Sequence, residues 1–287
     1  MSRILRSILG IGLLGAAASL LPAQDAPEPP KVLAIFREDI KEGKGAAHEQ
    51  SESRFMRAAA AAKFPVNVIG LQALTGTSQA WFLEAHDSFE SIAKTQAAMQ
   101  NPELETLDAL DGEYRSGSRS WIAVYRPDLS FHGQQLMQTL PKMRYFNIIT
   151  MRARLHYQEE FALLAKMAVA AAERSMDDQP VATYQVVSGA PSGLYILFEP
   201  SASLKALDEA PARSQNMLRA MGDARPTFMK LAGDTIAQEE ALLFAIDPKM
   251  SYVSQQVIAG DPAFWTPKRE EPAEPEKTAK PTGKRSK

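Results

Sequence analysis

A short motif occurs twice in this chain, and it constrains the fold more than any other feature of the sequence. Residues 125–131 read Tyr-Arg-Pro-Asp-Leu-Ser-Phe, and residues 246–252 read Ile-Asp-Pro-Lys-Met-Ser-Tyr. The proline and the serine keep their spacing. A second match lies upstream, where Phe82-Leu83-Glu84 before Ser88-Phe89 recurs as Leu197-Phe198-Glu199 before Ser203-Leu204. A period of about 115 residues is too long for a solenoid unit and is typical of a duplicated small domain.

The predicted elements follow the same order in both halves. In the first half, strands are predicted over 32–36, 66–74, 79–86 and 121–125, with helices over 45–63 and from residue 89. In the second half, strands are predicted over 145–151, 181–187, 194–198 and 241–246, with helices over 157–174, from about 203 and over 213–240. Each half is therefore predicted to be β-α-β-β-α-β, the ferredoxin-like arrangement of the α+β class.

This order, the duplication and the strand that ends at Glu84 before a helix start (Asp-Ser-Phe-Glu-Ser-Ile, residues 87–92) resemble the dimeric α/β-barrel superfamily. In that superfamily, two ferredoxin-like units pack sheet against sheet around a central cavity. The resemblance covers residues 32–252 and implies two tandem repeats that form one fused barrel; another packing of the two units is the alternative. Its members include cofactor-free monooxygenases, haem-handling enzymes and small isomerases, so it implies where a site lies but no reaction.

We divide the chain into a signal peptide (1–23), a Pro-rich spacer (24–31), a first repeat (32–131), a linker (132–143), a second repeat (144–252) and a C-terminal extension (253–287) that we expect to be disordered from about residue 266. The first segment has two arginines, an apolar run and a small residue at its end, which is typical of a secretory signal. We therefore expect an exported protein, periplasmic or extracellular, without membrane insertion after cleavage.

Composition excludes several classes of function. The chain has no cysteine, so thiol nucleophiles, thiolate metal sites and iron–sulfur clusters are excluded. Its formal net charge is −2, and no clustered basic face indicates a nucleic-acid partner. We expect the partner to be a small apolar molecule or a periplasmic protein.

Aromatic residues on predicted strands are the candidates for a ligand pocket. The candidate residues are Trp81, Trp121, Tyr125, Tyr184 and Tyr195. Side chains alternate along a strand, so the two sides of each strand face different surroundings, and the sequence leaves open which side faces the cavity. An aromatic cavity would suit a planar apolar ligand, whereas ordinary core packing is the simpler interpretation of each residue.

His86 is the candidate catalytic residue. It ends a predicted strand beside Asp87, where a carboxylate could orient the ring and raise its basicity. Neighbouring strand residues point to opposite faces, however, and Asp87 more naturally begins the next helix.

Two helical segments have the spacing of metal ligands. His156 lies three and four residues before Glu159 and Glu160, and His48 lies four residues before Glu52. Both helices are predicted to cover the outside of the sheets, so we interpret the two groups as solvated faces and predict no metal site. No cofactor is predicted, and haem held by a histidine is a lesser alternative.

Three hypotheses for the function follow. The first is a non-enzymatic exported protein whose fused barrel binds a small apolar ligand or a protein partner. The second is a cofactor-independent oxygenase or isomerase with His86 as base and Trp81 or a tyrosine shaping the pocket. The third is a purely structural periplasmic scaffold.

Overall fold

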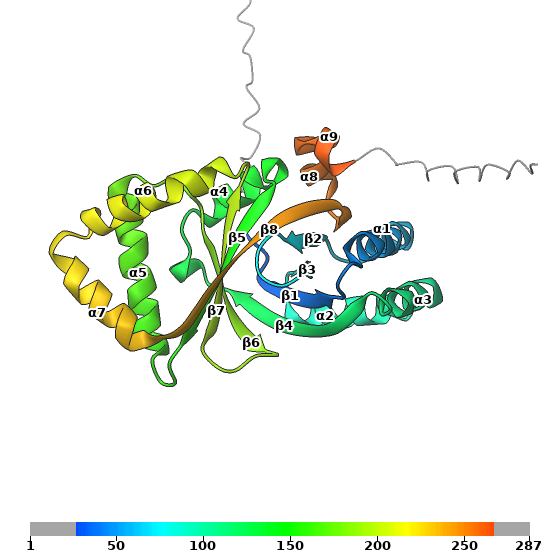
Figure 1. Ribbon diagram of the computed structural model, residues 1–287, viewed down its shortest axis with the longest axis horizontal. Helices are drawn as coiled ribbons and strands as arrows, with labels where there is room; N and C mark the ends of the chain where they lie inside the picture. Colours follow the sequence, from blue (N-terminus) through cyan, green and yellow to red (C-terminus); the bar gives the residue numbers. More distant parts are fainter. Residues whose placement is uncertain (1–26, 267–287) are drawn as a thin grey trace, which may run out of the picture.

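The computed structural model describes residues 27–266, and these form an eight-stranded closed barrel with helices on its outside (Figure 1). The predicted signal peptide, the start of the spacer and the extension from residue 267 lie outside the described residues. No helix within residues 27–266 combines the length and the apolar character needed to cross a membrane.

The first half of the barrel contains β1 (Val32–Ile40), α1 (Gly45–Ala61), β2 (Val68–Ala73), β3 (Gln79–His86), α2 (Phe89–Met99), α3 (Pro102–Asp111) and β4 (Arg115–Tyr125). A connection of η1 (Pro127–Leu129), α4 (Gly133–Thr139) and η2 (Leu140–Lys142) follows. The second half contains β5 (Tyr145–Ala153), α5 (Gln158–Ser175), β6 (Ala182–Ser188), β7 (Leu194–Ser201), α6 (Lys205–Ala220), η3 (Gly222–Ala224), α7 (Arg225–Thr235) and β8 (Ile236–Tyr252). Two short helices, α8 (Gln255–Gly260) and α9 (Pro262–Trp265), end the described chain.

Local sequence explains where several helices begin. Ser88 caps α2 by accepting a hydrogen bond from the backbone N–H of Ser91, and Asn101 caps α3 through the N–H groups of Glu103 and Leu104. Pro102 follows Asn101 at the first helical position, where its missing N–H costs nothing.

The strands close the barrel in the order β1-β3-β2-β8-β5-β7-β6-β4, and each pair of neighbours is antiparallel. The four strands of each half are adjacent. Two seams therefore join the halves, where β2 pairs with β8 and where β4 pairs with β6. Closure pairs every one of these strands with a neighbour on both sides, although the extensions of β4 (115–121) and β8 (236–242) are paired on one side only.

The repeated Pro-x-x-Ser motif lies at these two seams, and its serine makes the same two kinds of hydrogen bond at each. At one seam, Ser130 donates a hydrogen bond to the carbonyl of Arg126 and accepts one from the N–H of Thr183. At the other, Ser251 donates to the carbonyl of Asp247 and accepts from the N–H of Gly70. Each serine thus fixes the strand end of one half against the other half.

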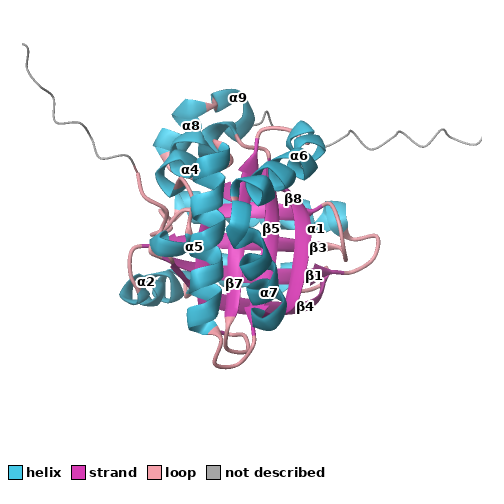
Figure 2. Ribbon diagram, turned by 90° about the vertical axis from the view of Figure 1, so that its left-hand side faces the viewer, coloured by secondary structure: helices cyan, strands magenta, loops and turns pink. Residues whose placement is uncertain are grey.

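Helices cover opposite sides of the barrel. In Figure 1, α1, α2 and α3 lie on the right of the strands and α5, α6 and α7 on the left. Figure 2 shows α4, α8 and α9 together at one end of the strands. The inside is filled by alternate apolar residues of all eight strands, and its centre is tightly packed around Ile35, Trp81, Ile148 and Phe244.

The structure corrects the prediction at several places. Residues 236–240, predicted as helix, begin strand β8, and β4 begins at Arg115 instead of Trp121. Both extra segments are mostly exposed and polar, so they lack the apolar alternation of a buried strand. Helices α3, α4, α8 and α9 were not predicted. Within the predicted C-terminal extension, the buried Trp265 donates a hydrogen bond to the carbonyl of Pro141 at 2.9 Å.

Candidate functional site

A cavity of about 470 Å³ opens at the barrel end that α4 and α8 cover; we call it the apolar cavity. Its wall is mostly aliphatic and aromatic, and includes Leu33, Ile69, Leu83, Phe146, Phe198, Met137 and Val257. Polar side chains occur among the lining residues at Glu28, Asp87, Ser91 and Lys94. This combination of an apolar wall with a few polar groups is typical of sites for small organic molecules.

Tyr184 and Tyr125, two predicted pocket residues, belong to this end of the barrel. Tyr184 lines the apolar cavity, and its hydroxyl donates a hydrogen bond to the carbonyl of Pro30 at 2.9 Å. The ring of Tyr125 lies 5.4 Å from that of Tyr184, centroid to centroid. Burial raises the pKa of both hydroxyls, so both remain protonated at neutral pH.

His86 does not line the cavity but reaches it through a second side chain. It is buried on the outer face of β3, with Nδ1 2.9 Å from Ser91 Oγ and Nε2 3.2 Å from Glu84 Oε2. Ser91 lines the apolar cavity. The side chains Glu84, His86 and Ser91 thus form a hydrogen-bonded chain that ends at the cavity wall, whereas Asp87 lines the cavity without a contact to the His86 ring.

A second cavity, of about 450 Å³, lies at the opposite end of the same strands; we call it the arginine cavity. Its lining is polar and includes Arg37, Arg119, Arg152, Gln79, Thr77, Thr150, Gln238 and Glu240. The packed centre of the barrel separates it from the apolar cavity.

Trp81 and Trp121, two further predicted pocket residues, hold an arginine at this second end. The guanidinium carbon of Arg37 lies 4.4 Å from the ring centroid of Trp81 and 4.3 Å from that of Trp121. Gln79 accepts a hydrogen bond from the indole of Trp81 at 2.6 Å and one from Arg37 at 3.4 Å. Burial, together with the nearby charge of Arg119, lowers the pKa of Arg37 to about 10, which still leaves it charged at neutral pH.

Tyr195 lies outside the barrel and lines neither cavity. Its ring stacks on Phe161 of α5 at a centroid distance of 3.9 Å. The reason is the alternation along β7, which places Ile196 in the barrel interior and Tyr195 under the helix. The five predicted aromatic residues are therefore divided among both barrel ends and one helix–sheet interface.

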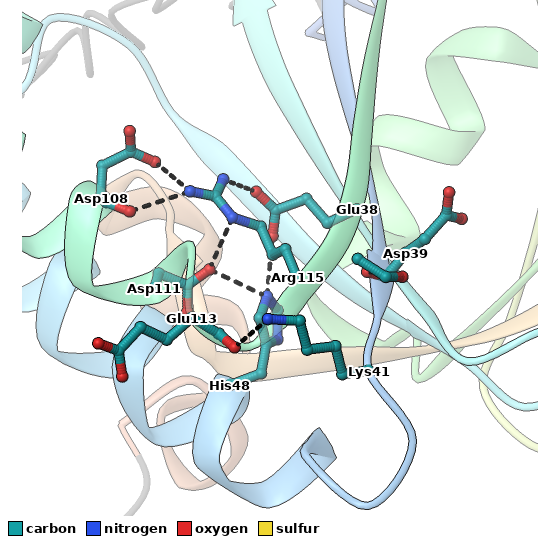
Figure 3. A network of polar contacts seen from close by, with 9 residues as sticks. Glu38, Asp39, Lys41, His48, Asp108, Asp111, Glu113 and Arg115 are labelled. Atoms are coloured by element: carbon teal, nitrogen blue, oxygen red, sulfur yellow. Dashed lines mark hydrogen bonds and ion pairs between the residues drawn. The ribbon is translucent and has the colours of Figure 1, made fainter.

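A group of charged residues lies between α1, α3 and the sheet, and we call it the buried network: Glu38, His48, Glu52, Asp111 and Arg115. Figure 3 labels Glu38, His48, Asp111 and Arg115. His48 Nε2 lies 2.8 Å from Glu38 Oε2 and 3.5 Å from Asp111 Oδ2. Arg115 pairs with Glu38 at 2.5 Å and with Asp111 at 3.2 Å. A further ion pair joins Arg115 to Asp108 at 3.0 Å.

The prediction that His48 and Glu52 form a solvated face is wrong. Both are almost fully buried, at 3% and 6% exposure, because their face of α1 packs on the outer side of β1, where Glu38 points toward the helix. Sequence contained one signal for this arrangement: Glu38 alternates with the apolar residues Ala34, Phe36 and Ile40 on one face of β1. His156, in contrast, is exposed in the turn before α5.

The buried network has the donor set of a divalent cation site. One ligand atom from each of Glu38, His48, Glu52 and Asp111 lies within 4.8 Å of the others. Arg115, however, already supplies positive charge to two of the carboxylates. Burial and the neighbouring charge of Glu38 raise the pKa of Glu52 well above its usual range, which further reduces the negative charge to be balanced.

The haem alternative assumed a histidine ligand. The chain has four histidines, at positions 48, 86, 132 and 156, and none of them lines either cavity. The two cavities therefore offer no histidine to hold haem.

No protein-family model matches this sequence, and no curated protein matches it either. Solved structures do match it. A candidate monooxygenase from Lactobacillus acidophilus NCFM has 9% identity and a TM-score of 0.50, covering 79% of this chain and 97% of that one. An anthrone oxidase-like protein has 10% identity and a TM-score of 0.51, covering 77% and 94%. A mutant chlorite dismutase from Candidatus Nitrospira defluvii has 12% identity and a TM-score of 0.47, covering 77% and 92%.

These similarities concern the fold. The first two structures share the barrel fold of this chain, and no family is identified. The chlorite dismutase supports no inference about this chain, because its TM-score lies below 0.5.

Proposed function

We propose that this protein binds a small, mostly apolar molecule in the apolar cavity. The observation that carries the proposal is the cavity itself, about 470 Å³ with an aliphatic and aromatic wall at one barrel end. That volume lies within the range of sites for small organic ligands, roughly 300–1,000 Å³. Ser91, Asp87 and Lys94 supply polar groups that would orient one end of the ligand.

We also infer that the barrel consists of two tandem ferredoxin-like units. The same order of elements in both halves, four adjacent strands from each half, and the matching roles of Ser130 and Ser251 support this. The proposed ligand site then lies where the two units meet, since strands of both contribute to its wall.

A cavity-filling substitution tests the ligand site. Met137 lines the cavity from α4, and Met137→Trp should occupy part of its volume. We expect saturable binding of N-phenyl-1-naphthylamine, an uncharged apolar fluorophore, to the wild type and at least tenfold weaker binding to the variant. Met229→Trp, at an exposed position of α7, is the matched control and should bind as the wild type does. Absence of saturable binding, or equal binding by Met137→Trp, would refute the proposal.

A second candidate function is cofactor-independent oxygenase or isomerase chemistry in the same cavity. The chain of Glu84, His86 and Ser91 favours it, because it places a buried histidine one hydrogen bond from the cavity wall. The Ser91 hydroxyl donates to the carbonyl of Ser88 at 2.8 Å, so a substrate proton could pass through it to His86 only after the hydroxyl turns away from Ser88. Structural similarity to a candidate monooxygenase and an anthrone oxidase-like protein adds support at the level of the fold. Trp81, expected to shape this pocket, lies toward the other end of the barrel and has no part in it.

The second candidate is tested with anthrone and dissolved oxygen. We expect oxygen uptake to fall at least a hundredfold in His86→Gln and in Ser91→Ala. His156→Gln, at an exposed histidine, is the control. If uptake does not exceed that of heat-denatured protein, or if both variants match the wild type, acid–base oxidation of this substrate class is excluded and ligand binding remains.

A further inference from the structure

We propose that the arginine cavity binds a small oxyanion, such as a carboxylate, sulfate or phosphate group, through Arg37, Arg119 and Arg152. The site is distinct from the apolar cavity, since it lies at the other end of the barrel beyond the packed centre. It does not depend on the function proposed above.

The charge of the lining favours an anion. Three guanidinium groups and one carboxylate, that of Glu240, line this cavity. Arg119 is partly balanced by Asp39, whose Oδ2 atom lies 3.1 Å from its Nη2 atom. Arg152 forms no side-chain hydrogen bond or ion pair with any of residues 27–266, and Glu240 is exposed at the rim. The lining therefore keeps an excess of positive charge that an anion would neutralise.

Arg37 is held in place for such a contact. The two indole rings flank its guanidinium at 4.4 and 4.3 Å and restrict its side-chain rotation. Among the described residues its Nη2 atom donates to Gln79, and its Nε atom is buried without a hydrogen-bond partner. A guanidinium that is already oriented loses little entropy when it binds an oxyanion, and its planar donors match the oxygens of that group.

The remaining lining atoms are compatible with the same ligand class. Thr77 and Gln238 place a hydroxyl and an amide donor in the same cavity, whereas the Thr150 hydroxyl donates to the carbonyl of Glu240 at 3.5 Å. Charge-assisted hydrogen bonds from arginine, supplemented by neutral donors, are the usual means by which proteins hold carboxylate, sulfate and phosphate groups.

Calorimetric titration of the full chain tests the proposal. The probes are inorganic phosphate, sulfate and benzoate, each at constant ionic strength with chloride as the comparison ion. We expect saturable binding of at least one probe and a change in tryptophan fluorescence with the same midpoint, since Trp81 and Trp121 contact Arg37. Tighter binding of phosphate or sulfate would indicate a free inorganic ion, and tighter binding of benzoate a carboxylate on an organic molecule.

Arg152→Gln is the principal variant, because this side chain has no partner within the described residues whose loss could unfold the protein. We expect it to weaken binding at least tenfold, while Arg57→Gln, at an exposed arginine of α1, leaves binding unchanged. Arg37→Gln, with its melting temperature measured in parallel, should abolish binding. Met137→Trp should bind the anion as the wild type does, which separates this site from the apolar cavity. No saturable binding beyond that of chloride, or equal binding by Arg152→Gln, would overturn the proposal.

Discussion

The two helix–sheet interfaces of the barrel occupy equivalent positions but have opposite chemistry. The fourth residue of α1 is His48 and that of α5 is Phe161; the eighth residues are Glu52 and Ala165. Under α1, the seventh residue of β1 is Glu38, and under α5, the seventh residue of β5 is Met151. One interface is thus a network of buried charges, and the other an apolar cluster in which Phe161 stacks on Tyr195.

This difference shows that the barrel frame does not determine what fills its interfaces. An apolar interface stabilises by removing surface from water and is insensitive to pH. A buried network must overcome the desolvation of every charge, so it is stable only while all of its members are present. Substitutions should therefore affect the two sides in different ways.

The largest expected effect is at Arg115. Arg115→Met removes the positive charge that balances Glu38 and Asp111, both nearly inaccessible to solvent, and should lower the free energy of unfolding by about 3–5 kcal/mol. Urea denaturation of the wild type and the variant measures this loss of stability. Arg57→Met, on the exposed face of α1, is the control and should stay within about 0.5 kcal/mol of the wild type. If Arg115→Met lowers the free energy of unfolding by less than about 1 kcal/mol, the buried carboxylates do not depend on Arg115 for their charge balance.

The next effect concerns pH. Because burial raises the pKa of Glu52 in the folded protein above its usual 4.5, this carboxyl favours folding below that pH, and the contribution is lost as the pH rises through the folded value. Glu52→Gln stays neutral and escapes this loss. Relative to the wild type, its stability should rise with pH above about 4.5, by at most about 1.4 kcal/mol per pH unit.

Denaturation curves at several pH values provide the measurement for Glu52. Glu173→Gln, exposed on α5, should leave the pH dependence of stability unchanged. Parallel curves for the wild type and Glu52→Gln would mean that Glu52 is ionised in the folded protein.

A smaller effect should be equal on the two sides. Ser130→Ala and Ser251→Ala each remove two hydrogen bonds, one to a carbonyl and one from a seam amide, and each should cost about 1–2 kcal/mol. The seams lie on different sides of the barrel, so the two losses should add in the double variant. Thermal denaturation checks this, with the exposed Ser192→Ala as control. Clearly unequal losses would show that the seams, like the helix interfaces, have diverged.

The smallest effect is expected from chelation. If Arg115 supplies the balancing charge, excess EDTA should change the melting temperature by less than about 1 °C. A fall of several degrees, with one divalent ion per chain found by elemental analysis before treatment, would instead place a cation on Glu38, His48, Glu52 and Asp111.

The barrel was largely predictable because its strands repeat and because the Pro-x-x-Ser motif marks both seams. Prediction failed where elements are short or polar. The extension of β8 through Gln238 and Glu240 has helix-forming residues, and only pairing with β5 makes it a strand.

The candidate sites were less predictable, since they depend on which side of each strand faces inward. Trp81 and Tyr184 were identified as pocket residues, but nothing in their spacing places them toward opposite ends of the barrel. Arg37 was missed, although it shares a strand face with the apolar Leu33 and Ile35. Likewise, the spacing of His48 and Glu52 was recognised, and only the contact with Glu38, from another element, shows that they are buried.

Because a single chain closes the barrel, a ligand bound at either end contacts two halves with different side chains. β1 and β5 lie four positions apart and run in the same direction, so their sixth residues, Arg37 and Thr150, line the same cavity. A barrel built from two identical chains would present each of these side chains twice, and a guest could enter in either of two equivalent orientations. Here the guanidinium of Arg37 lines one side of the cavity and the hydroxyl of Thr150 the other, so the two orientations of a bound ligand differ in energy. A ligand with two different ends therefore has one preferred orientation.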